Sequence, residues 1–227
     1  MRAGGERRAA DGSLGPRRGA GVVSLRAWAR DLRERMQERA ERGDLGRWRR
    51  SVVEPVAGRV LDVGIGMGFD LPWFRRAATV IGVDPDADAL RRAGKRAGRA
   101  SARVALVAAD AEALPFRDRA FDAAVATLAF CTIPRPERAL AELRRVVRPG
   151  GPVRMLEHVR LEHPVWGRLQ DWVTPLTVRF AGGCHQNRRT VETVRGSGLE
   201  LLGLRPHARG YFVEIDARVP AADATAP

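Results

Sequence analysis

The chain has few of the residues that hold small secreted or metal-dependent domains together. Its 227 residues include two cysteines, Cys131 and Cys184, which lie far apart in sequence and outside any C-x-x-C pattern. Two thiols are too few for a disulfide framework or a typical zinc site, and no histidine has the spacing to complete one. We therefore predict no metal site, and we expect the reducing cytoplasm.

Long apolar runs are also missing. No segment approaches the length that spans a bilayer, and residues 1 to 21 lack the apolar centre of a signal peptide. The sequence thus predicts a cytoplasmic protein whose membrane contact is at most peripheral.

Lysine is nearly absent, although the formal net charge is +13. Lys95 is the single lysine among 40 basic residues, and the arginines are spread along the whole chain. Nucleic-acid binding would favour one basic stripe with aromatic residues between the charges. The pattern therefore predicts no specific nucleic-acid partner, only weak attraction to acidic surfaces.

A glycine-rich turn is the most informative feature that is present. An apolar run, Val60 to Val63, leads into glycines at 64, 66 and 68. Such a run predicts a buried strand, and the glycines indicate a tight turn that a ligand can approach closely. The spacing fits neither G-x-G-x-x-G, because residue 69 is Phe69, nor a P-loop, because no Lys-Ser/Thr follows. A helix is expected near Asp70, with Pro72 in its first turn.

Four further β-rich runs follow, and helical patterns separate them. They cover residues 79–84, 103–110, 121–127 and 153–157. Alternating β and α elements predict a parallel sheet with right-handed crossovers. Asp62, Asp84 and Asp110 lie at the ends of the first three runs, so they should form a polar pocket at one rim, with Asp84 placed to bind ribose hydroxyls. A purely structural glycine turn in another α/β protein is the alternative.

These segments, with residues 110–116 and 148–151, resemble the successive motifs of class I S-adenosylmethionine-dependent methyltransferases (methyltransferase type 11 domain) over roughly residues 50 to 219. The resemblance implies an α/β, Rossmann-like three-layer sandwich. Its seven-stranded sheet would be mostly parallel with an antiparallel last strand. The last two strands would cover about residues 199–206 and 210–219.

The resemblance also implies S-adenosyl-L-methionine as cofactor. The glycines would lie beside its methionine part, and Asp62 would hold its amino group directly or through water. Asp84 would bind the ribose, Asp110 and the Ala111 N–H would bind the adenine, and the residues after the fourth strand would lie near the sulfonium. The cofactor-binding set is Asp62, Gly64, Gly66, Gly68, Asp84, Pro85, Asp110, Ala111, Thr127 and Leu128.

A finer similarity rests on residues 156–159, 166–175, 182–185 and Arg188. These segments are similar to the branch of small thiol S-methyltransferase-like proteins, with quinone and phospholipid methyltransferases as more distant relatives. The implied function is in-line methyl transfer to a small lipophilic acceptor, with thiol sulfur favoured. Phospholipid or quinone-type N- or C-methylation is an alternative, and a catalytically idle fold that binds a cofactor or a partner is another. The Asn-Pro-Pro-aromatic motif common in RNA methyltransferases is absent.

The expected organisation is a single methyltransferase domain over residues 24–219, with tails at 1–23 and 220–227. N-terminal helices would occupy residues 24–54. The first would carry an apolar stripe that either contacts a membrane or the substrate or packs on the domain: Leu25, Trp28, Leu32 and Met36. The sequence does not indicate the oligomeric state.

Residues 160–198 form an insertion that predicts the acceptor side of the site. Trp166, Trp172, Phe180 and Arg188 are the candidate substrate-binding residues, although the apolar ones could equally pack on the sheet. A helix here is expected to break near Pro175. His158 and His185 are candidate general bases near neutral pH, with a structural hydrogen-bonding role as the alternative for each.

Overall fold

The structure, a computed structural model, describes residues 25–180 and 183–221. The tail predicted at residues 1–23, Ser24 and nearly all of the predicted C-terminal tail lie outside this range. The chain divides into two compact units, residues 1–39 and 40–227, and the sheet and the candidate site belong to the second.

Helix α1 runs from Leu25 to Glu41. The side chains of Leu25 and Trp28 are outside the described part of the chain, so both interpretations of the apolar stripe stay open. Among the described residues, no helix has the length and apolar character needed to cross a membrane.

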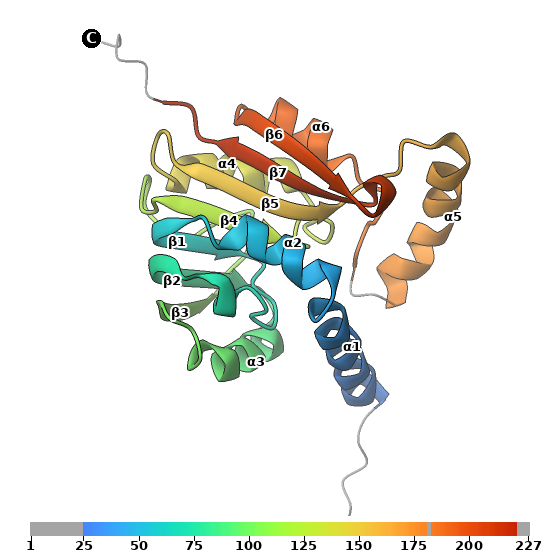
Figure 1. Cartoon of the computed structure of the whole chain (residues 1–227), viewed down its shortest axis with the longest axis horizontal. Helices are drawn as coiled ribbons and strands as arrows, with labels where there is room; N and C mark the ends of the chain where they lie inside the picture. Colours follow the sequence, from blue (N-terminus) through green and yellow to red (C-terminus); the bar gives the residue numbers. More distant parts are fainter. Residues whose placement is uncertain (1–24, 181–182, 222–227) are drawn as a thin grey trace, which may run out of the picture. The chain divides into compact units, whose positions relative to one another are not determined.

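Seven strands form one sheet in the order β3-β2-β1-β4-β5-β7-β6 (Figure 1). Strand β7 pairs antiparallel with β5 and β6, and the other neighbouring strands pair in parallel. This confirms the predicted Rossmann-like sheet. The strands are β1 Ala57–Val63, β2 Arg76–Asp84, β3 Arg103–Ala108, β4 Ala123–Thr127, β5 Pro152–His158, β6 Glu200–His207 and β7 Phe212–Arg218.

Two apolar cores, one on each face of the sheet, make the three layers. Side chains alternate along β1, so Val60 packs with Val52 of α2 on one face and Leu61 packs with Leu140 of α4 on the other. Helices α2 (Asp44–Val53) and α3 (Ala87–Ala97) contribute to the first face. Helices α4 (Pro136–Val146) and α6 (Thr190–Gly196) contribute to the second.

The helix expected near Asp70 is a single 3₁₀ turn, η1, over Leu71–Trp73. Pro72 lies in this turn, as predicted for the first turn of the helix. Phe74 then leaves the helical region, with ψ of 65°, and is fully buried. Because β2 begins at Arg76, no room remains for a longer helix.

Helix α5 runs from Pro164 to Phe180 without the break predicted near Pro175, so that prediction was wrong. A proline removes one backbone hydrogen bond, which need not end a helix of 17 residues. A second 3₁₀ turn, η2 (Ala208–Gly210), joins β6 to β7.

Candidate active site

The glycine turn after β1 adopts a backbone that L side chains rarely take. Gly64, Gly66 and Gly68 have φ of +68°, +52° and +79°. A Cβ on Gly64 would lie 2.5 Å from the Cβ of Ala129, in the loop after β4. The Gly66 N–H donates to Oδ2 of Asp84 at 2.9 Å. The turn therefore needs glycine, and it brings its backbone against both neighbouring strands of the sheet.

Asp62 is a buried carboxylate without a partner. Its side chain is fully buried, and among the described residues neither carboxylate oxygen has a hydrogen-bond partner. Burial, with a further contribution from Asp70, raises the pKa of Asp62 well above its usual value. A buried acid of this kind is costly unless a cation or a hydrogen-bond donor approaches it.

Arg49 of α2 connects the neighbouring acidic groups, although nothing in the sequence around it predicted this role. Its guanidinium NH1 contacts Oδ1 of Asp70 at 2.5 Å and also donates to Oγ1 of Thr127. Nε and NH2 bind Glu41, both at 2.9 Å. Thr127 donates in turn to Oδ2 of Asp70 at 2.6 Å. Asp70 and Glu41 therefore share the positive charge of Arg49, whereas Asp62 has no hydrogen-bond partner among the described residues.

Asp84 is the last residue of β2, and Asp110 follows β3. Asp84 accepts the N–H groups of Gly66 and Asp86, both at 2.9 Å, and burial raises its pKa. Asp110 is exposed and accepts the Glu112 N–H at 2.9 Å. The structure thus places the three predicted acids at the same rim, on the adjacent strands β1, β2 and β3. Pro85 is exposed and Ala111 is buried beside them. Their roles in binding stay predictions.

The loop after β4 is held in place by hydrogen bonds to Glu157 of β5. Leu128 begins the loop with φ of +56°, which is unusual for leucine, and its N–H donates to the Leu156 carbonyl at 2.7 Å. The next three backbone N–H groups, from Ala129 to Cys131, donate to the Glu157 carboxylate at 2.9 to 3.3 Å. Burial nevertheless raises the pKa of Glu157 to about 8. Glu157 was not predicted as a functional residue. The sequence signal that could have revealed it is an acid within the apolar run of the fifth strand.

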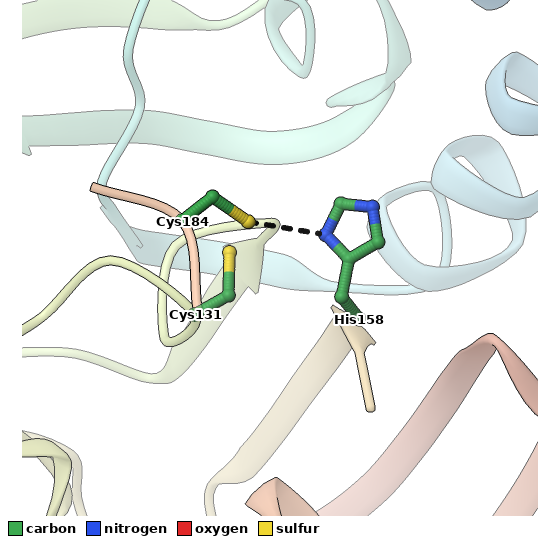
Figure 2. A group of neighbouring side chains, drawn as sticks. All are labelled: Cys131, His158 and Cys184. Atoms are coloured by element: carbon green, nitrogen blue, oxygen red, sulfur yellow. Dashed lines mark hydrogen bonds between the residues drawn. The ribbon is translucent and has the colours of Figure 1, made fainter. Parts of the chain in front are cut away.

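Cys131, His158 and Cys184 come together at this rim from three separate segments (Figure 2). Their sulfur and nitrogen atoms all lie within 4.8 Å of one another, and Cys184 Sγ is 3.8 Å from Nδ1 of His158. The neighbouring Cys131 thiol, followed by His158, lowers the pKa of Cys184 to about 5, while the same contact raises the pKa of Cys131. Residue spacing did not predict this cluster, because its three members lie far apart in the sequence.

The second candidate base, His185, lies beside the cluster. Its backbone N–H donates to the Cys131 carbonyl at 2.7 Å, and its Nδ1 lies 2.9 Å from the Gly183 carbonyl. His158 instead packs against Phe212 with the two rings tilted by 36° and their centroids 4.6 Å apart. A general-base role for either histidine stays a prediction.

The candidate substrate residues differ in their surroundings: the two tryptophans are exposed, whereas Arg188 is bound to backbone carbonyls. Trp166 and Trp172 of α5 are 56% and 75% exposed, and the side chain of Phe180 is outside the described residues. Arg188 donates through NH1 to the carbonyls of Phe130, at 2.7 Å, and Ile133. Arg188 therefore ties its own loop to the loop after β4, and direct contact with an acceptor stays a prediction.

Comparison with known proteins supports the fold and matches part of the chain to a known domain. Residues 61–155 match the family described as "Methyltransferase domain". The demethylmenaquinone methyltransferase of Renibacterium salmoninarum is 34% identical over 142 residues, 60% of this chain and 57% of that protein. The phosphatidylethanolamine N-methyltransferase of Cereibacter sphaeroides is 37% identical over 103 residues, 44% of this chain and 51% of that protein. The chain thus spans little more than half the length of these relatives.

Among solved structures, an S-adenosylmethionine-dependent methyltransferase from Mesorhizobium loti superimposes with a TM-score of 0.62 at 18% identity, covering 78% of this chain and 98% of that one. This likeness shows the fold. Together, the match over residues 61–155 and the sheet topology show that this part of the chain is similar to the methyltransferase domain and shares the fold of that solved structure.

Proposed function

We propose that the protein transfers a methyl group from S-adenosylmethionine to a small lipophilic acceptor. The observation that carries the proposal is Asp62, a buried acid with no partner at the carboxyl end of β1. The methionine part of the cofactor carries an ammonium group, which would supply the missing donor and charge. Among the described residues, an added Cβ at Gly66 would meet only the Gly64 carbonyl within 4 Å, at 3.8 Å, so the backbone there is open to a ligand.

The other acids would position the rest of the cofactor. Asp84 would accept the ribose hydroxyls, while Asp110 and the Ala111 N–H would bind the adenine. Pro85 would lie beside the ribose, and Thr127 and Leu128 would lie near the sulfonium. When bound, the cofactor supplies an activated methyl group. The chain needs mainly to orient the two reactants in line and to exclude water.

A lipophilic acceptor is supported by α5. Five apolar residues of this helix are exposed at helical spacing, and their exposed fractions are 45% to 75%: Val165, Trp166, Leu169, Trp172 and Leu176. Exposed apolar surface of this kind typically marks a binding site. A thiol acceptor is favoured because a modest lowering of its pKa supplies the thiolate near neutral pH. A carbon acceptor instead needs an enolate or phenolate.

A quinol or a phospholipid headgroup is the second candidate acceptor. It is favoured by the relatives, which are named as a demethylmenaquinone methyltransferase and a phosphatidylethanolamine N-methyltransferase. The two candidates differ in where the acceptor resides, because a phospholipid is presented by a membrane surface.

Transfer of a labelled methyl group tests these proposals. The protein would be incubated with S-adenosylmethionine carrying the label and with alkyl and aryl thiols, reduced quinones, or phosphatidylethanolamine vesicles. Labelled thioether without vesicles supports the thiol, and label in the lipid phase supports the second candidate. If the protein binds the cofactor and labels none of these acceptors, both acceptor assignments fail.

A further inference from the structure

We propose that Cys131, His158 and Cys184 form a binding site for a zinc-type divalent cation. The three side chains come from the loop after β4, the last residue of β5 and the segment after α5, and they point toward one another (Figure 2). Cysteine thiolates and a neutral imidazole are the ligands that Zn²⁺ prefers.

The spacing of the three ligand atoms suits a tetrahedral cation. With Zn–S of about 2.3 Å and Zn–N of about 2.0 Å, neighbouring ligand atoms of a tetrahedron lie about 3.5 to 3.8 Å apart. Cys184 Sγ and His158 Nδ1 are already 3.8 Å apart, and no pair among the three atoms exceeds 4.8 Å. Small side-chain rotations would therefore close the cluster around one ion.

The backbone on which the ligands stand is fixed independently of any ion. The Cys131 N–H is held by Glu157 at 3.3 Å. The Cys131 carbonyl accepts the N–H of His185 at 2.7 Å, and the Cys184 carbonyl accepts the Thr177 hydroxyl at 3.1 Å. A site held in this way loses little conformational entropy when it binds a ligand.

Burial and charge also favour a cation. Both sulfur-bearing side chains are buried, and the His158 ring is packed against Tyr211 and Phe212. Two thiolates in such a place are costly because charge is expensive away from water. A dication would neutralise both thiolates, and the site as a whole would then carry no net charge.

Three protein ligands leave the fourth tetrahedral position open, as in catalytic rather than structural zinc sites. If the proposed methyl transfer is correct, on which this step rests, that position would take the acceptor thiol. The S–H proton would pass to solvent, and a sulfur lone pair would form the S–CH₃ bond. The electron pair of the broken methyl–sulfonium bond would leave with S-adenosylhomocysteine.

Cobalt substitution tests the site without requiring activity. The reduced full-length protein would be titrated with Co²⁺ and then with Zn²⁺ under nitrogen. We expect one Co²⁺ per chain, with a sulfur-to-cobalt charge-transfer band and the visible bands of a tetrahedral ion, all displaced by Zn²⁺. Addition of an alkyl thiol should shift these bands, which would place the acceptor on the ion even if no methyl transfer is detected.

Variants then identify the ligands. Cys131→Ser, Cys184→Ser and His158→Ala should each lose stoichiometric binding. His163→Ala should retain it, because His163 is an exposed histidine outside the cluster. Circular dichroism would establish that each variant is folded. The proposal is overturned if the wild type shows no tetrahedral cobalt spectrum, or if the folded cysteine variants bind as the wild type does. It is also overturned if the reduced thiols take up no ion and simply pair as a disulfide in air.

Discussion

Arg49 and Asp70 form a buried ion pair although 21 residues separate them in the chain. NH1 of Arg49 lies 2.5 Å from Oδ1 of Asp70, and the two side chains are 3% and 2% exposed. The same guanidinium binds Glu41 and Thr127, so one arginine joins the end of α1, the turn after the glycines and the end of β4. This connection sets the charge around Asp62.

Replacing Arg49 should destabilise the protein strongly. Arg49→Met would leave Asp70 and Glu41 without their cation, which typically costs about 3–5 kcal/mol for a buried pair. Arg50→Met on the same helix is the matched control, because its pair with Glu54 is open to solvent and should contribute little to stability. Urea unfolding would measure both. Equal losses for the two variants would contradict the assigned role of Arg49.

Gly64 should not tolerate alanine. Its φ of +68° and the 2.5 Å approach of an added Cβ to Ala129 predict a loss of about 1–3 kcal/mol in unfolding free energy. Cofactor affinity should fall as well, because the turn would move. Gly196→Ala is the control: Gly196 ends α6, a Cβ there would meet nothing within 4 Å, and the change should be neutral or stabilising by up to about 1 kcal/mol. Thermal unfolding and a cofactor titration would compare them. If Gly64→Ala behaves like its control, the turn does not require glycine.

Cofactor binding should release a proton from Asp62. The pKa of this group is raised by burial in the ligand-free folded protein, so the folded state keeps a proton that the unfolded state releases. Stability of the ligand-free protein should therefore fall as pH rises through the interval between the two pKa values. An ammonium beside Asp62 would lower its pKa, and affinity should increase with pH over the same interval.

Calorimetric titrations in two buffers with different ionisation enthalpies would count the released protons. Asp62→Asn should abolish the release and weaken binding. A wild type that takes up or releases no proton at any pH in the interval would refute the placement of the cofactor's ammonium beside Asp62.

Trp172 should affect the acceptor rather than the cofactor. Trp172→Ala would remove a large apolar surface that is 75% exposed and so contributes little to the core. We expect KM for a lipophilic acceptor to rise roughly tenfold, the effect of losing about 1.4 kcal/mol of apolar contact. Cofactor affinity and stability should be unchanged. Leu202→Ala, at an exposed residue of β6, is the control. Unchanged acceptor kinetics for Trp172→Ala would remove α5 from the acceptor site.

The sheet could be predicted because its signals are local. Each parallel strand is an apolar run, and the glycine turn fixes where β1 ends, so Asp62, Asp84 and Asp110 could be placed at one rim from their positions alone. The 3₁₀ turn at Pro72 could not be predicted in this way. Its short length depends on how soon β2 begins and on the burial of Phe74.

The parts of the site that depend on distant contacts could not be predicted. Arg49 is one of many arginines, and nothing in its neighbourhood indicates that it reaches Thr127, 78 residues away. Cys131 and Cys184 looked unrelated by spacing, yet the folding of α5 and its following segment brings them to His158. Contacts of this kind arise from the arrangement of elements, which residue spacing does not encode.

Titration calorimetry with S-adenosylmethionine and S-adenosylhomocysteine, on the wild type and on Asp84→Ala, tests the central claim most directly. The wild type should bind both ligands, and Asp84→Ala should lose about 1–3 kcal/mol of binding free energy with its charge-assisted hydrogen bonds. Asp118→Ala, at an exposed acid of the chain, should bind as the wild type does. A wild type that binds neither ligand would contradict the account and favour a fold that binds some other partner.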